Sequence, residues 1–386
     1  MKSTYPLKIH NDENWRTLSG FFPDTWRHKA FELGAIKRLR GFPSVDILLR
    51  MLLIHLGEGV SLKQTCNIAN QAGWADVSDV TLLNRLRQSS DWFRWLAREL
   101  VSNHHPARID LTCPEWLADY RVKSIDATVV SEPGSTGTDW RLHYCIELFE
   151  LLCQQFVLTG PEQGETVTNF QFKPGDLVVG DRAYCSKSAI TTLTAQGVDW
   201  LFRYKHKSVH LLTTDANTEA VDLFGWLESL KEGFVSELPV CIKGGSGEEV
   251  RLIGIRKNEQ AAQHARKKYR AKMSRRQAVI HKETEQLQDY ILVLTSLTDP
   301  AIQAAQVLEL YRLRWQIEIA FKRLNSLIGL GHLPKYDPQS CRAWLHGKLF
   351  IALLVDLLVE EARLFSPWGY PLQDGYRQSP LSMERG

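Results

Sequence analysis

The chain has 386 residues, more than one ordinary domain holds, and 44% of them are hydrophobic, which is enough for packed cores. The 47 lysine and arginine residues nearly balance the 44 aspartate and glutamate residues, so net charge alone does not indicate nucleic-acid binding. The chain has seven cysteines and no Cys-x-x-Cys pair, which argues against a disulfide scaffold and a zinc site. Its longest apolar run, 349–355, ends at Asp356 and is too short for a membrane span.

The N-terminal part, residues 1–115, is predicted to be a helical DNA-binding domain. The protein is expected to be cytoplasmic, because its N-terminus shows no secretory signal pattern. Two short helices are expected at 61–70 and 78–87, joined by a turn that contains glycine. Such a pair resembles a helix-turn-helix, whose second helix here carries Arg85 and Arg87 as candidate DNA contacts. Ordinary helix packing is the alternative interpretation.

Short strands replace helices from residue 116, and residues 116–205 are predicted to form the first part of a catalytic core. Three antiparallel strands are expected first, and a strand, a helix and a strand follow. Their expected ranges are 121–130, 140–149, 151–158, 177–181, 186–195 and 200–204. This order predicts an α/β fold with an RNase H-like (retroviral integrase-like) core.

Residues 206–289 are predicted to be a mainly β insertion that does not continue this core. Between Arg256 and Lys282 the insertion carries ten lysine and arginine residues and a single acid, Glu259. A basic segment on an otherwise acidic protein is typical of a phosphate-binding element. A solvated helix face explains the same charges, and the sequence does not decide between the two.

The second part of the core is expected at 290–365, followed by a loosely ordered tail at 366–386. It contains a long helix at 301–327, with a polar stripe on the face opposite its apolar side. The stripe consists of Tyr311, Arg314, Glu318, Lys322 and Asn325. A solvated helix with an Arg314–Glu318 ion pair is the ordinary alternative. The last helix is expected to serve the core, with dimerisation as the alternative.

Two aspartates lie where strands are expected: Asp126 falls inside an apolar strand, and Asp181 ends another. A carboxylate in such a place is costly to desolvate unless it binds a cation or a partner group. A hydrogen-bonded strand acid and a turn residue are the ordinary explanations, taken one at a time. They do not predict acids on two strands of one RNase H-like sheet together with a third, Glu318, on a later helix.

Two motifs connect these acids with a known group of enzymes. The segment 179–184, Val-Gly-Asp-Arg-Ala-Tyr, resembles the second-aspartate motif of bacterial insertion-sequence DDE transposases. The pattern Tyr311-x2-Arg314-x3-Glu318 resembles most of the Tyr-Arg-Glu-Lys signature of the insertion sequence four type. Further likenesses lie at 125–128, 140–143, 164–166 and 202–203.

Two positions depart from the pattern of that family. The signature expects lysine seven residues after the glutamate, where this chain has Asn325, although Lys322 keeps a cation on the same face. Family members often carry a tryptophan that stacks on a flipped base, and Tyr290 occupies the corresponding place.

The resemblance implies a transposase that cuts and joins DNA strands with two Mg²⁺ ions, for which Mn²⁺ can substitute. Asp126 is expected to bridge the two ions, with Asp181 completing one metal site and Glu318 the other. Water would free a 3′-OH at the transposon end, and that hydroxyl would attack the opposite strand to give a hairpin and later the target DNA. The hairpin is implied by the resemblance alone.

The same resemblance assigns DNA contacts. Tyr311, Arg314 and Lys322 are expected to grip phosphates near the cut, and Arg182 either contacts a phosphate or pairs with Asp181. The implied partners are the terminal inverted repeats of the transposon and the target DNA, bound by a homodimer at the bacterial nucleoid. No membrane partner is expected.

Two other functions share these residues. An RNase H-like nuclease would use the same acids to cut without strand transfer. A catalytically impaired relative that binds DNA and represses transposition is suggested by Asn325 and Tyr290.

Overall fold

The computed structural model describes residues 12–103, 113–135, 137–215, 219–245, 247–329, 333 and 337–364. The chain forms two compact units. The first, here called the helical unit, comprises Met1–Ile109, Val130–Gly137 and Arg323–Gly386. The second, the sheet unit, comprises Asp110–Val129 and Thr138–Lys322.

Helices pack around aromatic side chains in the helical unit. They are α1 (Asp12–Ser19), α2 (Trp26–Glu32), α3 (Val45–Glu58), α4 (Leu62–Gln71), α5 (Asp79–Gln88), α6 (Ser90–Asn103) and α13 (Pro338–Leu364). The rings of Trp26 and Trp92 stack with centroids 6.0 Å apart. Phe350 of α13 contacts Phe93 of α6 with ring centroids 6.3 Å apart. The described α4 and α5 are the two short helices that the sequence predicts at 61–70 and 78–87.

The last helix, α13, packs against α3, α5 and α6. The expected domain boundaries placed it with the catalytic core, whereas here it lies in the helical unit. Gly347 shows how closely it packs, because a Cβ there would lie 2.4 Å from Cδ1 of Leu56 in α3. No helix in the described ranges, α13 included, has the length and apolar character that crossing a membrane requires.

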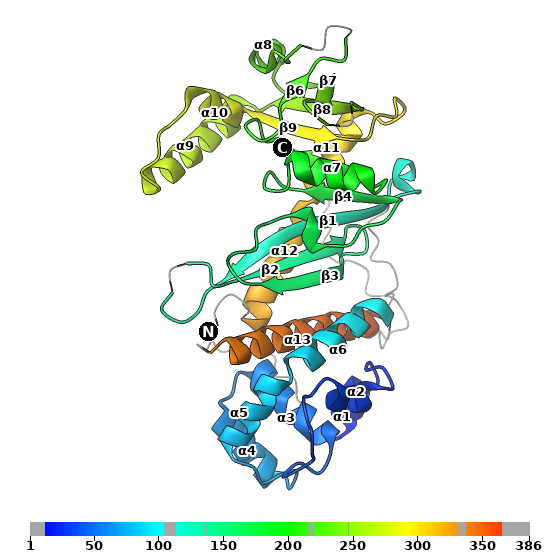
Figure 1. Ribbon diagram of the computed structural model, residues 1–386, viewed down its shortest axis with the longest axis vertical. Coiled ribbons are helices and arrows are strands. Elements are labelled where there is room, and N and C mark those ends of the chain that lie inside the picture. The colour runs from blue at the N-terminus through cyan, green and yellow to red at the C-terminus, as the bar shows by residue number, and fades with distance from the viewer. Residues whose placement is uncertain are drawn as a thin grey trace, which may run out of the picture. The chain divides into compact units, whose positions relative to one another are not determined.

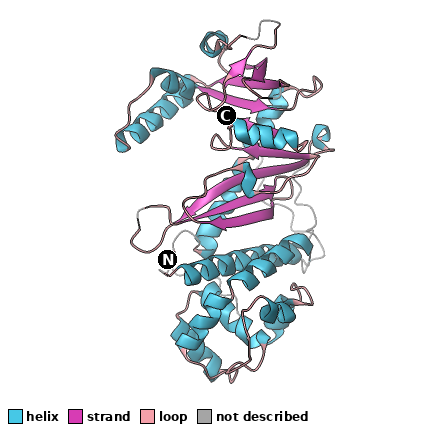
Figure 2. Cartoon of the chain, in the orientation of Figure 1, coloured by secondary structure: helices cyan, strands magenta, loops and turns pink. Residues whose placement is uncertain are grey.

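One sheet of nine strands organises the sheet unit, in the order β3-β2-β1-β4-β5-β9-β8-β7-β6 (Figure 2). Its strands are β1 (Arg121–Val130), β2 (Trp140–Glu147), β3 (Leu152–Thr159), β4 (Asp176–Gly180), β5 (Asp199–Arg203), β6 (Leu211–Leu212), β7 (Val235–Ile242), β8 (Glu249–Arg256) and β9 (Tyr290–Thr295). The strands β1, β4 and β5 run parallel, and the remaining recorded pairings are antiparallel. The fold is therefore mixed α/β with a large mixed sheet.

Helices precede, connect and follow the strands of the sheet unit along the chain (Figure 1). They are η1 (Glu115–Leu117), η2 (Val167–Asn169), α7 (Lys187–Ala195), α8 (Leu223–Ser229), α9 (Glu259–Arg275), α10 (Lys282–Gln286), η3 (Leu287–Asp289), α11 (Ala304–Leu313) and α12 (Trp315–Ile328). The predicted succession of three strands followed by strand, helix and strand is present as β1 to β5 with α7. The hydroxyl of Ser186 accepts from the backbone N–H of Ala189 and caps α7.

The insertion differs from its prediction, because residues 206–289 were expected not to continue the core. Three of its strands, β8, β7 and β6, extend the same sheet. The reason is β9, which pairs antiparallel with β5 on one side and leaves its other edge open for β8. An unpaired strand edge is a template for a further strand.

The helix expected at 301–327 is interrupted at Arg314, where α11 ends and α12 begins. Around this point the backbone N–H of Arg314 donates to the carbonyl of Tyr311, and that of Ile317 donates to the carbonyl of Arg314. These are contacts between residues three apart, which tighten a helix locally and change its direction.

Candidate active site

Two aspartates, Asp126 and Asp181, lie side by side just beyond the carboxyl end of β4. This border of the sheet is here called the carboxylate edge. In the parallel pairing of β1 with β4, Ile125 is opposite Gly180. Asp126 and Asp181 each follow that pair by one residue, so they occupy matching positions on neighbouring strands. Neighbouring strands are about 4.8 Å apart, which brings the two carboxylates close to each other. The sequence prediction that these acids share one sheet is thus met by the observed register.

Backbone groups hold both carboxylates in place. Oδ1 of Asp126 accepts from the N–H of Ala127 at 2.8 Å, and Oδ1 of Asp181 accepts from the N–H of Ala183 at 2.7 Å. Gly180 allows the close approach behind Asp181, since a Cβ there would lie 3.0 Å from the ring of Phe202. The position of each aspartate is therefore fixed mainly by the main chain.

The pKa of Asp126 is raised from its usual value to about 7. Burial is the largest cause, and the negative charges on Asp181 and Glu165 add to it. The N–H of Ala127 and the charge on Arg314 lower the pKa without offsetting the burial. The Asp126 carboxyl therefore keeps its proton to a higher pH than an exposed aspartate does, unless a cation lies beside it.

Arg314 connects Asp126 with Glu318. Its Nη1 lies 3.6 Å from Oδ2 of Asp126, and its Nη2 donates to Oε1 of Glu318 at 2.7 Å. The Arg314 side chain is 15% exposed and the Glu318 side chain 41%. The Arg314–Glu318 ion pair expected as the ordinary alternative is present, yet the same guanidinium also faces the strand acids.

The remaining members of the predicted polar stripe separate into two groups. Tyr311 is 8% exposed, and the guanidinium carbon of Arg314 lies 5.8 Å from the centre of its ring. Lys322 is exposed, with Nζ 5.3 Å from the centre of the Trp315 ring, and Asn325 is exposed as well. Tyr311 and Arg314 therefore belong to the carboxylate edge, and Lys322 lies on an open surface.

Cations gather beyond Asp181 along the same edge. Burial lowers the pKa of Arg182, and the charge on Arg203 lowers it further. Burial followed by the charges on Arg203 and Arg182 lowers the pKa of Lys257 to about 8. Within the described chain, the buried Nε atoms of Arg182 and Arg203 have no hydrogen-bond partner. Such a group of positive charges is suited to an anion.

Three residues of this edge were not assigned by the sequence. Arg203 ends β5 and Lys257 follows β8, so the signal for both was a cation at a strand end next to the acids. Glu165 precedes η2, and its pKa is raised by burial and by the charge on Asp181. Its likeness to a family position at 164–166 was the signal that pointed to it.

Three predicted DNA contacts lie elsewhere. Tyr290 is 5% exposed within the apolar core, so stacking on a base would require this ring to leave the core. Arg85 and Arg87 belong to α5 in the helical unit. Arg87 is engaged there with the hydroxyl of Ser340 at 3.1 Å and the carboxylate of Asp337 at 3.2 Å.

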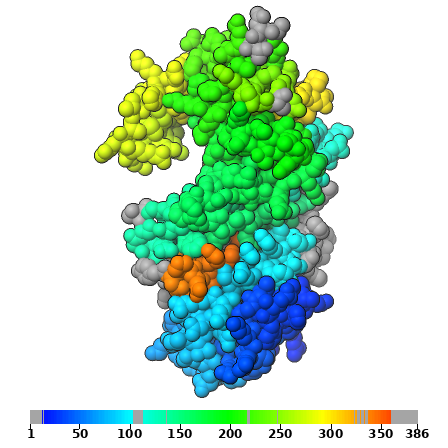
Figure 3. Space-filling model, viewed as in Figure 1, coloured from blue at the N-terminus to red at the C-terminus, as the bar shows by residue number. Residues whose placement is uncertain are grey.

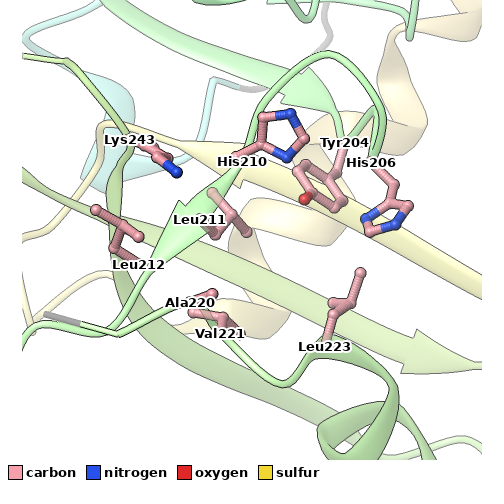
Figure 4. A pocket seen from close by; sticks show the side chains of 9 residues that line it. All are labelled: Tyr204, His206, His210, Leu211, Leu212, Ala220, Val221, Leu223 and Lys243. Atoms are coloured by element: carbon pink, nitrogen blue, oxygen red, sulfur yellow. The ribbon is translucent and has the colours of Figure 1, made fainter.

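A separate pocket of about 300 Å³ lies beside β6. Its lining is Tyr204, His206, His210, Leu211, Leu212, Ala220, Val221, Leu223 and Lys243. Figure 4 shows the rings of Tyr204 and His206 next to each other, with Lys243 on the far side of His210. The hydroxyl of Tyr204 donates to the carbonyl of Val209 at 2.9 Å. None of the three candidate catalytic acids lines this pocket.

The donors at the carboxylate edge are of the kind that hard divalent cations prefer. Asp126 and Asp181 offer oxygen atoms only, and their shared burial calls for added positive charge. Within the residues that the structure describes, no group of three His, Cys, Asp or Glu side chains is close enough to hold a metal ion. Glu318 is instead held by Arg314. The two aspartates thus fit a divalent cation in donor type and electrostatics.

Comparison with known proteins gives consistent matches. The family model described as "Transposase DDE domain" matches residues 118–354. The putative transposase InsL for insertion sequence element IS186A of Escherichia coli (strain K12) is 29% identical over 367 residues, which are 93% of this chain and 97% of that protein. The transposase for insertion sequence element IS421 of Escherichia coli is 29% identical over 368 residues, with the same two coverages.

More distant matches exist as well. The transposase for insertion sequence element IS231C of Bacillus thuringiensis subsp. berliner is 23% identical over 381 residues, which are 90% of this chain and 79% of that protein. A cryo-EM structure of a piggyBac transposase synaptic complex with hairpin DNA gives a TM-score of 0.45 at 10% identity, covering 93% of this chain and 68% of that one.

The matched region 118–354 is more than half of the chain and includes Asp126, Asp181 and Glu318. The chain belongs to the transposase DDE domain family, and it is a DNA transposase.

Proposed function

We propose that this transposase moves an insertion sequence by cut-and-paste transposition, with Asp126, Asp181 and Glu318 as its catalytic acids. The observation that carries the proposal is the register that places Asp126 beside Asp181. The raised pKa of Asp126 supports it, because a bound cation would favour the ionised form of this buried carboxyl.

Asp126 and Asp181 would hold one divalent ion, and Asp126 with Glu318 a second, with Mg²⁺ as the natural metal and Mn²⁺ as a substitute. When bound, two such ions activate the attacking oxygen and stabilise the leaving oxygen in phosphodiester chemistry. The chain's own part is to fix the carboxylates. The N–H groups of Ala127 and Ala183 do this for the two aspartates. Water would cut first, and the freed 3′-OH would then attack target DNA.

Arg314 supplies the link between the acids and the substrate. In this structure its guanidinium pairs with Glu318 at 2.7 Å and lies 3.6 Å from Asp126. A DNA phosphate is a bidentate acceptor of the same kind as a carboxylate, so it can take over the guanidinium and release Glu318 toward the aspartates. Tyr311 shields this exchange from water, and Arg182 offers a second phosphate contact.

The open surface of α12 would bind DNA farther from the cut. Lys322 is exposed beside Trp315, which is itself 54% exposed. The ammonium group of Lys322 could contact a phosphate, and the ring of Trp315 could stack on a sugar or a base. This arrangement supports membership of the Tyr-Arg-Glu-Lys group with Lys322 in place of the missing lysine at Asn325. We further propose a homodimer acting on DNA at the bacterial nucleoid, with one site for each transposon end.

The test is cleavage and joining of a labelled duplex that carries the element's terminal inverted repeats, with Mg²⁺ or Mn²⁺ added. Wild type is compared with Asp126→Asn, Asp181→Asn and Glu318→Gln. Glu309→Gln is the matched control, because Glu309 forms an exposed ion pair with Arg312 on the preceding helix. We expect cleaved and joined products from wild type and the control, and none from the three site variants.

Each other outcome identifies a different function. Cleavage that survives one of the three substitutions removes that residue from the site. Nicks without joined strands would indicate a nuclease. Tight binding of the repeats without any cleavage by wild type would indicate a repressor.

A further inference from the structure

Helix α9 is almost entirely exposed. Of its 17 residues only Ala262 is buried. The helix begins directly after β8, where the side chain of Asn258 caps it, and it touches the rest of the sheet unit mainly through η3. In Figure 1 α9 extends away from the sheet together with α10, and in Figure 3 its yellow surface projects from the green body of the same unit. A helix that buries so little contributes little to the core.

The cations of α9 divide between two faces. On the inner face, Arg266 pairs with Glu259 at 2.8 Å and Asp289 at 2.6 Å, and Arg270 pairs with Glu285. The pairs with Asp289 and Glu285 attach the helix to the following segment, and the pair with Glu259 lies within the helix. The inner cations therefore have a structural role.

The outer face carries cations without such partners. They are Lys267, Lys268, Lys272 and Arg275, and none of them forms an ion pair with an acid in the part of the chain that the structure describes. At about 100° per residue, Lys268, Lys272 and Arg275 fall within an arc of roughly 60°, on the side opposite Arg266. Lys267 flanks this arc.

Repulsion among these positive charges lowers the stability of α9, and no ion pair in the described part of the chain offsets it. Lys268 and Lys272 stand four residues apart, where like charges repel on a helix surface. In and beside the arc of Lys268, Lys272 and Arg275, the other side chains are alanines and His264, and Tyr269 lies about 60° beyond Lys272. An external anion explains such a face better than packing does.

The position of α9 suggests which anion. Lys257, the residue before its cap, is electrostatically coupled to Arg203 and Arg182 at the edge that bears the carboxylates. Arg203 ends β5, and Arg256 ends β8 at the same edge, opposite the first residue of β9. Cations thus continue from the edge beside Asp181 to the start of α9, all within the sheet unit.

We propose that the outer face of α9 binds the sugar–phosphate backbone of duplex DNA beside the segment that is cut, without reading its bases. The proposal rests on the transposase function given above. Lys268 to Arg275 span about 10 Å of helix axis, which equals about three base-pair steps of roughly 3.4 Å along the axis of the duplex. A protein partner is disfavoured because protein interfaces have apolar centres, which this face lacks.

The test measures how affinity for a labelled 40-base-pair duplex of arbitrary sequence depends on salt, with full-length protein in EDTA. The variant replaces Lys267, Lys268, Lys272 and Arg275 by glutamine. Four phosphate contacts contribute about 3.6 to the slope of log K against log salt, so the slope should fall by up to that amount. When salt is raised from 50 to 200 mM, the DNA affinity of wild type should therefore fall by a factor that is roughly a hundredfold larger than the factor for the variant.

Two controls keep the result interpretable. Lys267→Arg, Lys268→Arg, Lys272→Arg and Arg275→Lys, combined, preserve the charges and should preserve the slope. Glutamine at four exposed lysines of the same unit (Lys187, Lys207, Lys231 and Lys243) removes equal charge elsewhere and should change the slope little. Melting temperatures equal to wild type show that each variant is folded.

The outcomes separate this proposal from the transposase function. A wild-type slope in the α9 glutamine variant, or an equal loss in the remote-lysine control, overturns the role of α9 while leaving cleavage untouched. Failure of wild type to bind any DNA would instead contradict the transposase function. A change in oligomeric state without a change in slope would overturn the proposal by making α9 a contact between copies of the chain.

Discussion

The acids on the strands and the acid on the helix are held in different ways. Asp126 and Asp181 are positioned by strand register and by N–H groups of their own backbone. Glu318 is positioned by one flexible side chain, Arg314, and its own side chain is 41% exposed. In the proposed site, the backbone therefore fixes the strand pair, whereas Glu318 depends on a contact between two side chains.

Removing either strand acid should nearly abolish cleavage. Asp181→Asn keeps the shape of the side chain but removes a charge that no other residue can replace at that register. Loss of about 4 kcal/mol of charge stabilisation corresponds to roughly a 10³-fold slower reaction. Single-turnover cleavage of terminal-repeat DNA measures this, with Glu162→Gln, an exposed acid of the same unit, as control. Residual activity within tenfold of wild type would remove Asp181 from the chemistry.

Removing Arg314, which pairs with Glu318, should slow cleavage less than removing a strand acid does. Arg314→Gln removes the guanidinium that holds Glu318 and faces Asp126, and we expect cleavage to slow by about 10²-fold, a loss of about 3 kcal/mol. Arg312→Gln is the matched control, because Arg312 forms an exposed pair with Glu309. If both variants cleave equally well, Arg314 does not position the site.

Adding a side-chain carbon at Gly180, the residue before Asp181, should lower stability as well as activity. In Gly180→Ala the new Cβ would lie 3.0 Å from Phe202 and 3.2 Å from Cβ of Tyr184. We expect a loss of about 1–3 kcal/mol in the free energy of unfolding, as for overpacked cores. Denaturant unfolding measures it. A wild-type unfolding curve would mean that β4 and β5 do not need this close approach.

The raised pKa of Asp126 predicts a dependence of metal-free stability on pH. A carboxyl whose folded pKa is about 7, against about 3.9 when unfolded, binds more protons in the folded state between these values. Its contribution to stability is therefore full below about pH 4 and is lost as the pH rises to about 7, by at most about 1.4 kcal/mol per pH unit. Asp126→Asn should flatten this slope. An unchanged slope in Asp126→Asn would show that another group titrates.

The strand half of the site was predictable from sequence, and the physical reason is local. An acid inside the apolar run of β1 and another at the end of β4 are visible as exceptions to a strand pattern, and strand order then makes them neighbours. Glu318 was predicted from a helical stripe and a family motif. The break in the helix at Arg314 was not predicted, because neither glycine nor proline marks it in the sequence.

The parts that escaped prediction depend on long-range pairing. Residues 206–289 carry correct strand patterns, but only the pairing of β9 with both β5 and β8 shows that they extend the same sheet. Glu165, Arg203 and Lys257 come from three separate segments, and no spacing along the chain relates them. Their grouping at one edge follows from topology, which periodicity does not specify.

The central claim is that Asp126 and Asp181 form one cation site. Mn²⁺ binding to the protein at pH 8, followed by electron paramagnetic resonance of free Mn²⁺, tests it directly. We predict that wild type and Glu309→Gln bind the ion and that Asp126→Asn and Asp181→Asn each lose most of this binding. Equal Mn²⁺ binding by wild type and Asp181→Asn would contradict the account.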